Sequence, residues 1–214
     1  MQLRIKYAFG LLMTIAVVSA VPSLAQTATP ATAPAAPAAA TPDTSSRPKL
    51  AVGYTFLHSN APPGGCGCFN LNGGNATFAL PVKPGMFDLV GDITVTHTGG
   101  ISSSGYTLTL STFTVGGRYL HPLGHLPLEG YGQALIGVAH SSGTLIPTQS
   151  PGVTSNAGAT FVANLGGGLD LRINRRFSLR LAEADYLVTT FNNSVNNRQN
   201  HFRISSGVVI RFGK

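Results

Sequence analysis

The residues best suited to chemistry in this 214-residue chain are two carboxylates in the stretch RLAEADYLVTT. Glu183 and Asp185 lie two positions apart in a segment that is otherwise mostly apolar. Such a pair could do acid–base chemistry, in which one carboxyl group donates a proton and the other accepts one. It could equally be two charges on one face of a strand, because alternate residues of a strand point the same way. The choice depends on what that face contacts.

Two histidine–serine neighbours are the other candidates for catalysis. His58 precedes Ser59, and His140 precedes Ser141. A serine nucleophile needs a base, and the base needs a third group that orients it. The sequence places no carboxylate beside either pair, and such neighbours arise by chance in serine-rich segments. We therefore expect no catalytic residues and no cofactor.

Cys66 and Cys68 lie in the glycine-rich stretch GGCGCF. A disulfide between them would be strained, because only one residue separates them and the bond requires a defined Cα spacing. Export would bring both thiols into a compartment where disulfides form. The nearest further metal ligand is His58, so we expect no metal site. Two interpretations stay open, a strained loop disulfide and a free pair.

The first residues of the chain have the layout of an export signal. Arg4 and Lys6 precede an apolar run, and small residues before Gln26 provide a cleavage site, so residues 1–25 are interpreted as a cleaved signal peptide. Residues 26–48 are almost wholly Ala, Pro and Thr, a composition that cannot form a core and predicts a disordered linker. Residues 49–214 then make one domain by size.

The composition of the chain does not fit an ordinary soluble domain. Only 10% of residues are charged, against roughly 25% in typical domains. Mean hydropathy is +0.19, yet no apolar run beyond the signal is long enough for a spanning helix. The net charge of +7 is not gathered in Lys/Arg clusters with interleaved aromatics, so we expect no nucleic acid partner.

Alternation of apolar and polar residues runs through the domain. In the closing stretch HFRISSGVVIRF, Phe202, Ile204 and Ile210 share one phase, while Arg203 and Arg211 take the other. Side chains of a strand alternate between its two faces, so this strand has one apolar and one polar side. The same pattern predicts eight strands, at roughly 50–58, 75–82, 86–97, 106–120, 127–141, 159–173, 176–190 and 200–212.

The connections between these segments alternate in length. Those near KPG, HPLGHL and NRR are short, and those near 59–74, 98–105, 142–158 and 191–199 are long. Alternating short turns and long loops are typical of transmembrane barrels with an even number of strands. We therefore predict an all-β fold, an eight-stranded antiparallel up-and-down transmembrane β-barrel.

The placement of lysines indicates which face is outside. A soluble barrel of the lipocalin kind is the alternative, and its outer face would carry scattered lysines. The lysines of the domain are Lys49, Lys83 and Lys214, each at a strand end or turn. The apolar face is therefore predicted to face lipid and the polar face to line the lumen.

Ten charged residues fall on the polar phase and are predicted to form a lumen charge network. They are Asp88, Asp92, Arg118, Glu129, Asp170, Arg172, Glu183, Asp185, Arg203 and Arg211. Side chains fill the interior of an eight-stranded barrel, so buried charges there must pair with one another. Glu183 and Asp185 are accordingly interpreted as structural. Lys83, Arg175, Arg176, Arg180 and Lys214 are expected to gather at the end with the short turns.

Residues 49–214 resemble the small eight-stranded outer-membrane β-barrel proteins of the OmpA-transmembrane-domain and OmpX type. The closing HFRISSGVVIRFG ends in an aromatic residue, and the resemblance implies that Phe212 is the signal read by the barrel-assembly machinery. Gly213 and Lys214 follow it, which departs from the family pattern. The resemblance also implies residence in the cell outer membrane, contact with membrane lipids and lipopolysaccharide, periplasmic chaperones during biogenesis, and a monomer.

Two function classes follow for a barrel of this kind. The first is a non-enzymatic protein with a charge-plugged lumen and a structural, surface-binding or adhesive role. The alternative is a lipid-modifying enzyme, an acyl hydrolase or transferase acting on lipid A or phospholipid, since some small outer-membrane barrels have that activity. A small pore is disfavoured by the filled lumen.

Three histidines lie near the predicted loop-side strand ends on the apolar phase, His58, His97 and His140. Amphipathic rings are favoured at the boundary between lipid tails and head groups. These residues could form an outer girdle there with Tyr54, Phe56, Tyr106, Phe161 and Tyr186. The alternative is three unrelated histidines near loops.

Overall fold

The computed structural model describes residues 47–60, 68–101, 106–124, 126–143, 158–192 and 197–213. Within these ranges no helix is long and apolar enough to span a membrane. The predicted signal peptide and residues 26–46 of the predicted linker lie outside them. The described strands are β1 (Lys49–Ser59), β2 (Phe69–Lys83), β3 (Phe87–Ile101), β4 (Tyr106–Pro122), β5 (Leu128–Gly143), β6 (Gly158–Arg172), β7 (Phe177–Thr189) and β8 (Gln199–Arg211).

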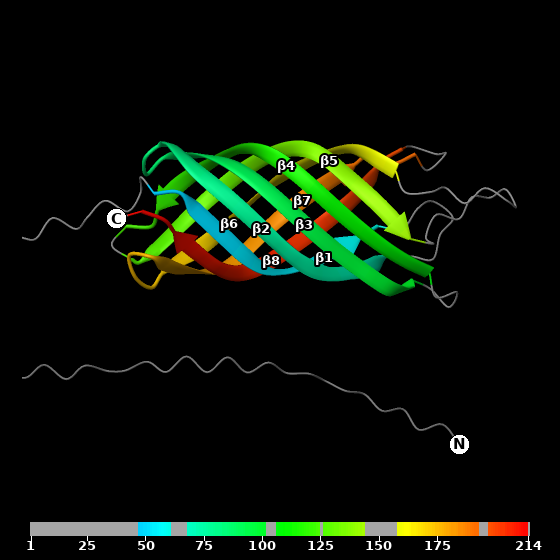
Figure 1. Cartoon of the computed structure of the whole chain (residues 1–214), viewed down its shortest axis with the longest axis horizontal. Coiled ribbons are helices and arrows are strands. Elements are labelled where there is room, and N and C mark those ends of the chain that lie inside the picture. The colour runs from blue at the N-terminus through cyan, green and yellow to red at the C-terminus, as the bar shows by residue number, and fades with distance from the viewer. Residues whose placement is uncertain are drawn as a thin grey trace, which may run out of the picture. The chain divides into compact units, whose positions relative to one another are not determined.

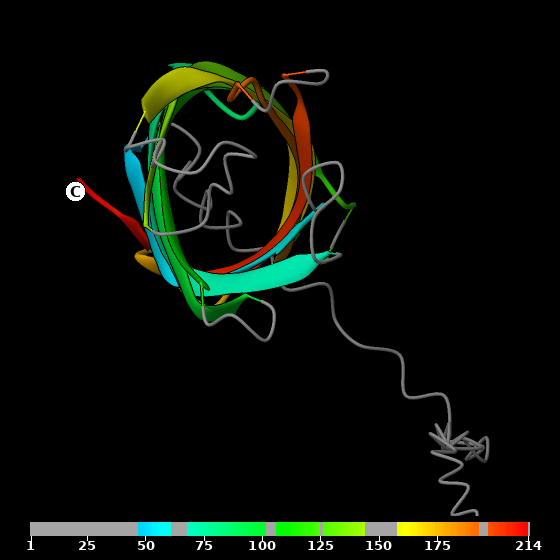
Figure 2. The same cartoon turned by 90° about the vertical axis from the view of Figure 1, so that its right-hand side faces the viewer.

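The eight strands form one closed antiparallel barrel, which confirms the predicted fold class. Each strand pairs with the next along the chain, and β8 pairs with β1 in register from Lys49 opposite Arg211 to Ser59 opposite His201. The strands cross the barrel axis obliquely (Figure 1), and the view along the axis shows a closed ring (Figure 2). Closure leaves no strand edge with unpaired backbone groups, which an apolar surrounding demands.

The two ends of the barrel differ in their connections. At one end, here the turn end, short turns join β2 to β3, β4 to β5 and β6 to β7. Gly85 and Gly124 adopt positive φ angles of 72° and 62° in the first two turns, a conformation that costs glycine little. In the third turn, the backbone N–H groups of Arg176 and Phe177 both donate to the Asn174 side chain at 2.8 Å. The opposite end, the loop end, carries the longer connections.

Two strands extend further toward the loop end than the sequence predicted. β2 begins at Phe69 rather than near 75, and β3 continues to Ile101 rather than 97. The added part of β2 contains Asn and Gly residues, which are disfavoured in strands. It pairs with β1 all the same, with Asn70 opposite His58 and Leu71 opposite Leu57. Tertiary pairing overrides the local preference here.

The outer face of the barrel is strongly apolar. Large hydrophobic side chains on every strand are exposed there, among them Val52, Phe113, Ile136 and Leu165, which are 53–67% exposed. Lys83, Arg175 and Arg176 are exposed at the turn end, as predicted. Such a continuous apolar face would be unstable in water and suits the hydrocarbon core of a membrane.

Candidate functional site

The candidate site is the interior of the barrel, where the polar phases of the strands converge. The six carboxylates of the described chain are all buried there: Asp88, Asp92, Glu129, Asp170, Glu183 and Asp185. Isolated charges would be very unfavourable at these positions, so each must find a partner inside the barrel. The partners form two groups, a central network and a cluster at the turn end.

Arg203 of β8 holds the central network together. Its guanidinium donates to Asp185 on the neighbouring strand at 2.7 and 2.9 Å and to Glu183 at 3.2 Å. On the far side it reaches Asp92 of β3 at 2.8 Å and Thr94 at 2.6 Å. Its side chain is fully buried. One cation therefore bridges three carboxylates and ties β8 and β7 to β3 across the lumen.

A β-bulge in β7 places a second arginine in the same network. The pairing of β7 with β8 shifts register between Arg180 and Glu183, so both side chains point inward although they are three positions apart. Arg180 donates to Asp170 at 3.0 Å and to Glu183 at 2.7 Å. The expectation that Arg180 gathers with the exposed cations of the turn end is therefore wrong, because regular alternation does not foresee the bulge.

Tyr131 lies between two arginines in the middle of this network. Arg118 and Arg180 lie over its ring at 4.1 and 4.9 Å from the centroid, a cation–π arrangement. The Tyr131 hydroxyl donates to Glu183 at 2.5 Å. Arg118 also lies 3.6 Å from Glu183. Glu183 is thus contacted by Tyr131 and by three arginines, which hold its carboxylate in the network.

The glycines of the stretch GGGLD make room for these side chains. A Cβ atom at Gly168 would clash with the Tyr131 hydroxyl and lie 2.6 Å from Cζ of the same ring. A Cβ atom at Gly166 would clash with the Asp185 carboxylate and lie 2.7 Å from the Asp185 Cα. Both glycines face the lumen from β6. Because these two glycines have no side chain, the network packs into the space where their side chains would lie.

The turn-end cluster is centred on Lys49. Its ammonium group lies 3.0 Å from Glu129 and 3.3 Å from Asp88. Arg172 reaches Glu129 at 3.6 Å but is 42% exposed, so it lies at the mouth of the barrel rather than inside. Arg211 is buried and donates to the Ser178 hydroxyl rather than to a carboxylate. Sequence reasoning missed Lys49 as an interior residue, because a lysine at a strand end is usually exposed.

The lumen is not polar over its whole length, as the alternation had predicted. An apolar cluster of buried side chains lies in it toward the loop end, and we call this cluster the loop-end layer: Leu57, Leu71, Leu110, Ala139, Val162 and Leu187. Polar side chains follow it on the inner face, among them Ser59, Thr189 and His201. Phe69, Leu108 and Phe191 pack against it. The strand patterns pointed to this layer only weakly, since single leucines on a polar phase look like irregularities.

The two histidine–serine neighbours do not form catalytic pairs. His58 and His140 are exposed on the outer face, whereas Ser59 and Ser141 are buried on the inner face. Adjacent residues of a strand point to opposite sides, so each histidine is separated from its serine by the barrel wall. The carboxylates of the described strands are all inside, where no outward histidine can reach them.

The remaining candidate residues lie at the barrel ends. Cys68 is exposed at the loop end, directly before β2. Cys66 lies outside the described residues, so the pairing of the two thiols stays a prediction. Phe212 is 45% exposed at the turn end, and its backbone N–H donates to Pro48 at 2.9 Å, which continues the β8–β1 pairing. Its role as an assembly signal also stays a prediction.

Replacement of Arg203 by Met should destabilise the barrel by about 3–5 kcal/mol, because three buried carboxylates lose their shared cation. Urea unfolding in detergent micelles, followed by circular dichroism, measures this loss. Arg176→Met is the matched control, since Arg176 is exposed in a turn and its replacement should change the free energy by less than about 0.5 kcal/mol. Equal midpoints for the two variants would contradict the bridging role of Arg203.

Replacement of Gly168 by Ala should cost about 1–3 kcal/mol, because the added methyl group overlaps the Tyr131 ring and the backbone carbonyl oxygen of Ala182. Gly91→Ala is the control, because no atom lies within 4 Å of the position its Cβ would take. In a Tyr131→Leu background the cost of Gly168→Ala should shrink, and a double-mutant cycle measures the coupling. Strictly additive changes in the free energy of unfolding would show that Gly168 does not make room for the Tyr131 side chain.

Comparison with known proteins gives structural matches alone. No protein-family model matches the sequence, and no curated protein matches it either. Neisserial surface protein A matches with a TM-score of 0.58 and 14% identity, over 77% of this chain and 97% of that one. The attachment invasion locus protein Ail of Yersinia pestis matches with a TM-score of 0.53 and 15% identity, over 78% and 99%. Ail in complex with the heparin analogue sucrose octasulfate matches with a TM-score of 0.51.

At 14% and 15% sequence identity, the similarity of this chain to the two proteins concerns the fold alone. The matched barrels are covered almost completely, so the eight described strands correspond to a whole barrel of that type. The chain has the fold of the small eight-stranded outer-membrane β-barrel proteins.

Proposed function

We propose that this chain is a non-enzymatic barrel of the bacterial outer membrane whose lumen is closed and whose loop end and outer face carry its function. The observation that supports this most directly is the double closure of the interior. Arg203 and Lys49 cross the lumen with ion pairs, and the loop-end layer fills it above them. A channel for ions or solutes would need a continuous polar path, which this packing interrupts.

The role that remains is structural or adhesive. The apolar outer face anchors the barrel in lipid, and the loop end faces the outside, as in barrels with long external loops. The matched protein Ail is named for attachment and invasion and binds a heparin analogue, which favours a surface-binding role for this chain as well. Lipopolysaccharide is the proposed lipid partner on the outer side.

The proposal includes a route to the membrane. Residues 1–25 direct export and are removed, and residues 26–48 remain as a linker in the periplasm. Periplasmic chaperones carry the unfolded chain, and the barrel-assembly machinery recognises Phe212 and closes β8 onto β1. The barrel then acts as a monomer, because closure leaves no strand edge for a second copy.

Purified mature protein in planar lipid bilayers should give no ion channels above the bare bilayer. The reason is that water and ions cannot pass both the central network and the loop-end layer. The control is a variant with Leu57, Leu110 and Leu187 changed to Ser, which keeps the ion pairs and should also be silent. Steps of reproducible conductance from the wild-type protein would contradict the closed lumen and favour a pore.

A further inference from the structure

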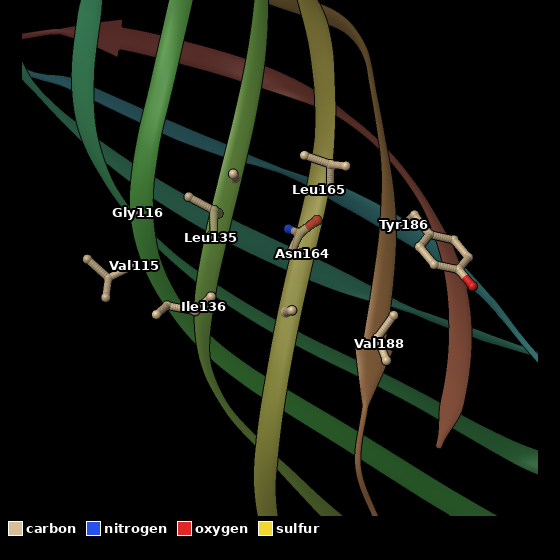
Figure 3. Close-up of a pocket in the computed structure, with 10 residues that line it drawn as sticks. Val115, Gly116, Leu135, Ile136, Asn164, Leu165, Tyr186 and Val188 are labelled. Carbon is tan, nitrogen blue, oxygen red and sulfur yellow. The ribbon is translucent and has the colours of Figure 1, made fainter. Parts of the chain in front are cut away.

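The outer face of the barrel is not evenly convex. A hollow of about 640 Å³ opens over β4 to β7, at mid-height of the barrel (Figure 3). Its floor consists of the small residues Gly116, Ala134 and Ala163, and larger side chains such as Val115, Leu165 and Tyr186 stand around it. Cross-strand pairing places small residues beside large ones here, since Ala134 lies opposite Leu165, and Ala163 lies opposite Ile136 and Val188.

A second, smaller hollow of about 180 Å³ lies nearer the loop end, over β3 to β6. Ala159 and Ser111 are its small residues, and Phe113, Val138 and His140 surround it. Along the β4–β5 seam the pairs Val115–Ile136, Phe113–Val138 and Ser111–His140 follow one another toward the loop end. The surface therefore changes from apolar at mid-height to polar at the loop end.

Polar side chains gather at that upper end. His97 of β3 contacts the Thr109 hydroxyl at 2.8 Å, and Thr109 is two positions from Ser111 on the same outward face of β4. His140 lies opposite Ser111 on β5. Two imidazoles and two hydroxyl groups thus share one patch on β3 to β5. Imidazole and hydroxyl groups donate hydrogen bonds, and this suits the oxygens of a phosphate group.

We propose that the two hollows and this patch form a binding site for one phosphorylated, acylated glycolipid of the lipid A type. An acyl chain lies in the larger hollow over Ala163, crosses the row Phe113–Val138–Phe161 and enters the smaller hollow over Ala159. A phosphate group lies against His140, Ser111 and the His97–Thr109 pair. This inference rests on the proposed outer-membrane location, which places the loop end in the leaflet that faces outside.

The choice of a lipid chain as occupant follows from the surroundings of the hollow. The surface around it is the same apolar face that anchors the barrel in lipid, so the hollow is continuous with the lipid interface. The hydrophobic effect contributes little to such binding, because lipid tails are as apolar as the wall. Selectivity for one lipid must come from van der Waals contacts in the hollows and from hydrogen bonds to the patch of imidazole and hydroxyl groups. The proposed lipid needs both the hollows and the patch, and the two lie next to each other on this face.

Native mass spectrometry of the full mature chain, refolded in micelles, tests the site. The protein is titrated with an equimolar mixture of bisphosphorylated lipid A, monophosphorylated lipid A and phosphatidylethanolamine. We expect one bisphosphorylated lipid A per chain to be retained in preference to the other two. Ala163→Phe, which fills the larger hollow from an outward position, should weaken retention about tenfold. His140→Ala should weaken it about fivefold and remove the preference between the two forms of lipid A.

Matched controls separate the site from general effects on the lipid face. Ala184→Phe adds the same bulk to an outward position of β7 that lines neither hollow, and His58→Ala removes an exposed histidine at the same end of the barrel. Both should bind lipid A as the wild type does.

Equal retention of lipid A by Ala163→Phe and Ala184→Phe would overturn the proposal. Retention of phosphatidylethanolamine in the same amount as lipid A would also overturn it. If the wild-type chain forms dimers and Ala163→Phe dissociates them, the hollow is occupied by a second copy of the chain and not by a lipid. Ion conductance by the wild-type protein would refute the closed lumen but leave this result unaffected.

Discussion

The fold depends on one constraint, that charges inside a closed eight-stranded barrel must be neutralised by one another. The barrel wall excludes both water and lipid head groups from the middle of the lumen, so no external partner is available to a buried carboxylate. Arg203 meets this constraint for Asp92, Glu183 and Asp185 together. The same contacts fix the position of β3 relative to β7 and β8, so electrostatic pairing and barrel geometry stabilise one another. Lys49 does the same between β1, β3 and β5.

Glycine and a bulge supply the local adjustments that the network needs. Tyr131 can lie between Arg118 and Arg180 only because Gly168 faces it without a side chain. Arg180 can face Glu183 only because β7 changes register between them. The strand preferences of individual residues are secondary to this packing, as the Asn- and Gly-rich beginning of β2 illustrates. The interior is a packed polar core surrounded by an apolar surface, the reverse of a soluble domain.

The alternation of apolar and polar residues along the sequence was sufficient to predict the strands, their antiparallel order and the inward position of the six carboxylates. It works because a strand that separates lipid from a polar interior has a strict period of two. It failed where the period breaks or where single residues depart from the pattern. The bulge hid Arg180, the position at a strand end hid Lys49, and the loop-end leucines looked like exceptions rather than a layer. The hollows on the outer face depend on cross-strand register, which sequence alone does not provide. The opposite directions of His140 and Ser141, by contrast, follow from alternation and could have been predicted.

The filled interior has a consequence for where this protein can act. Since ion pairs and the loop-end layer occupy the lumen, the surfaces left for the proposed binding role are the loop end and the lipid-facing wall. The described carboxylates lie inside the barrel in ion pairs, and the outward histidines lie among hydroxyl and amide groups such as Thr109 and Asn70. These surroundings support the proposed role in the recognition of lipids or external ligands.

The inside-out arrangement itself can be measured with one fluorophore, because the chain contains no tryptophan. Phe113 is 54% exposed on the outer face, and Phe113→Trp places a single indole there. In bilayers whose acyl chains carry bromine, the fluorescence of this residue should be strongly quenched, while iodide in the aqueous phase should have no effect. Quenching by iodide without quenching by brominated lipid would mean that the apolar face does not lie in the membrane, and the account of the barrel would be wrong.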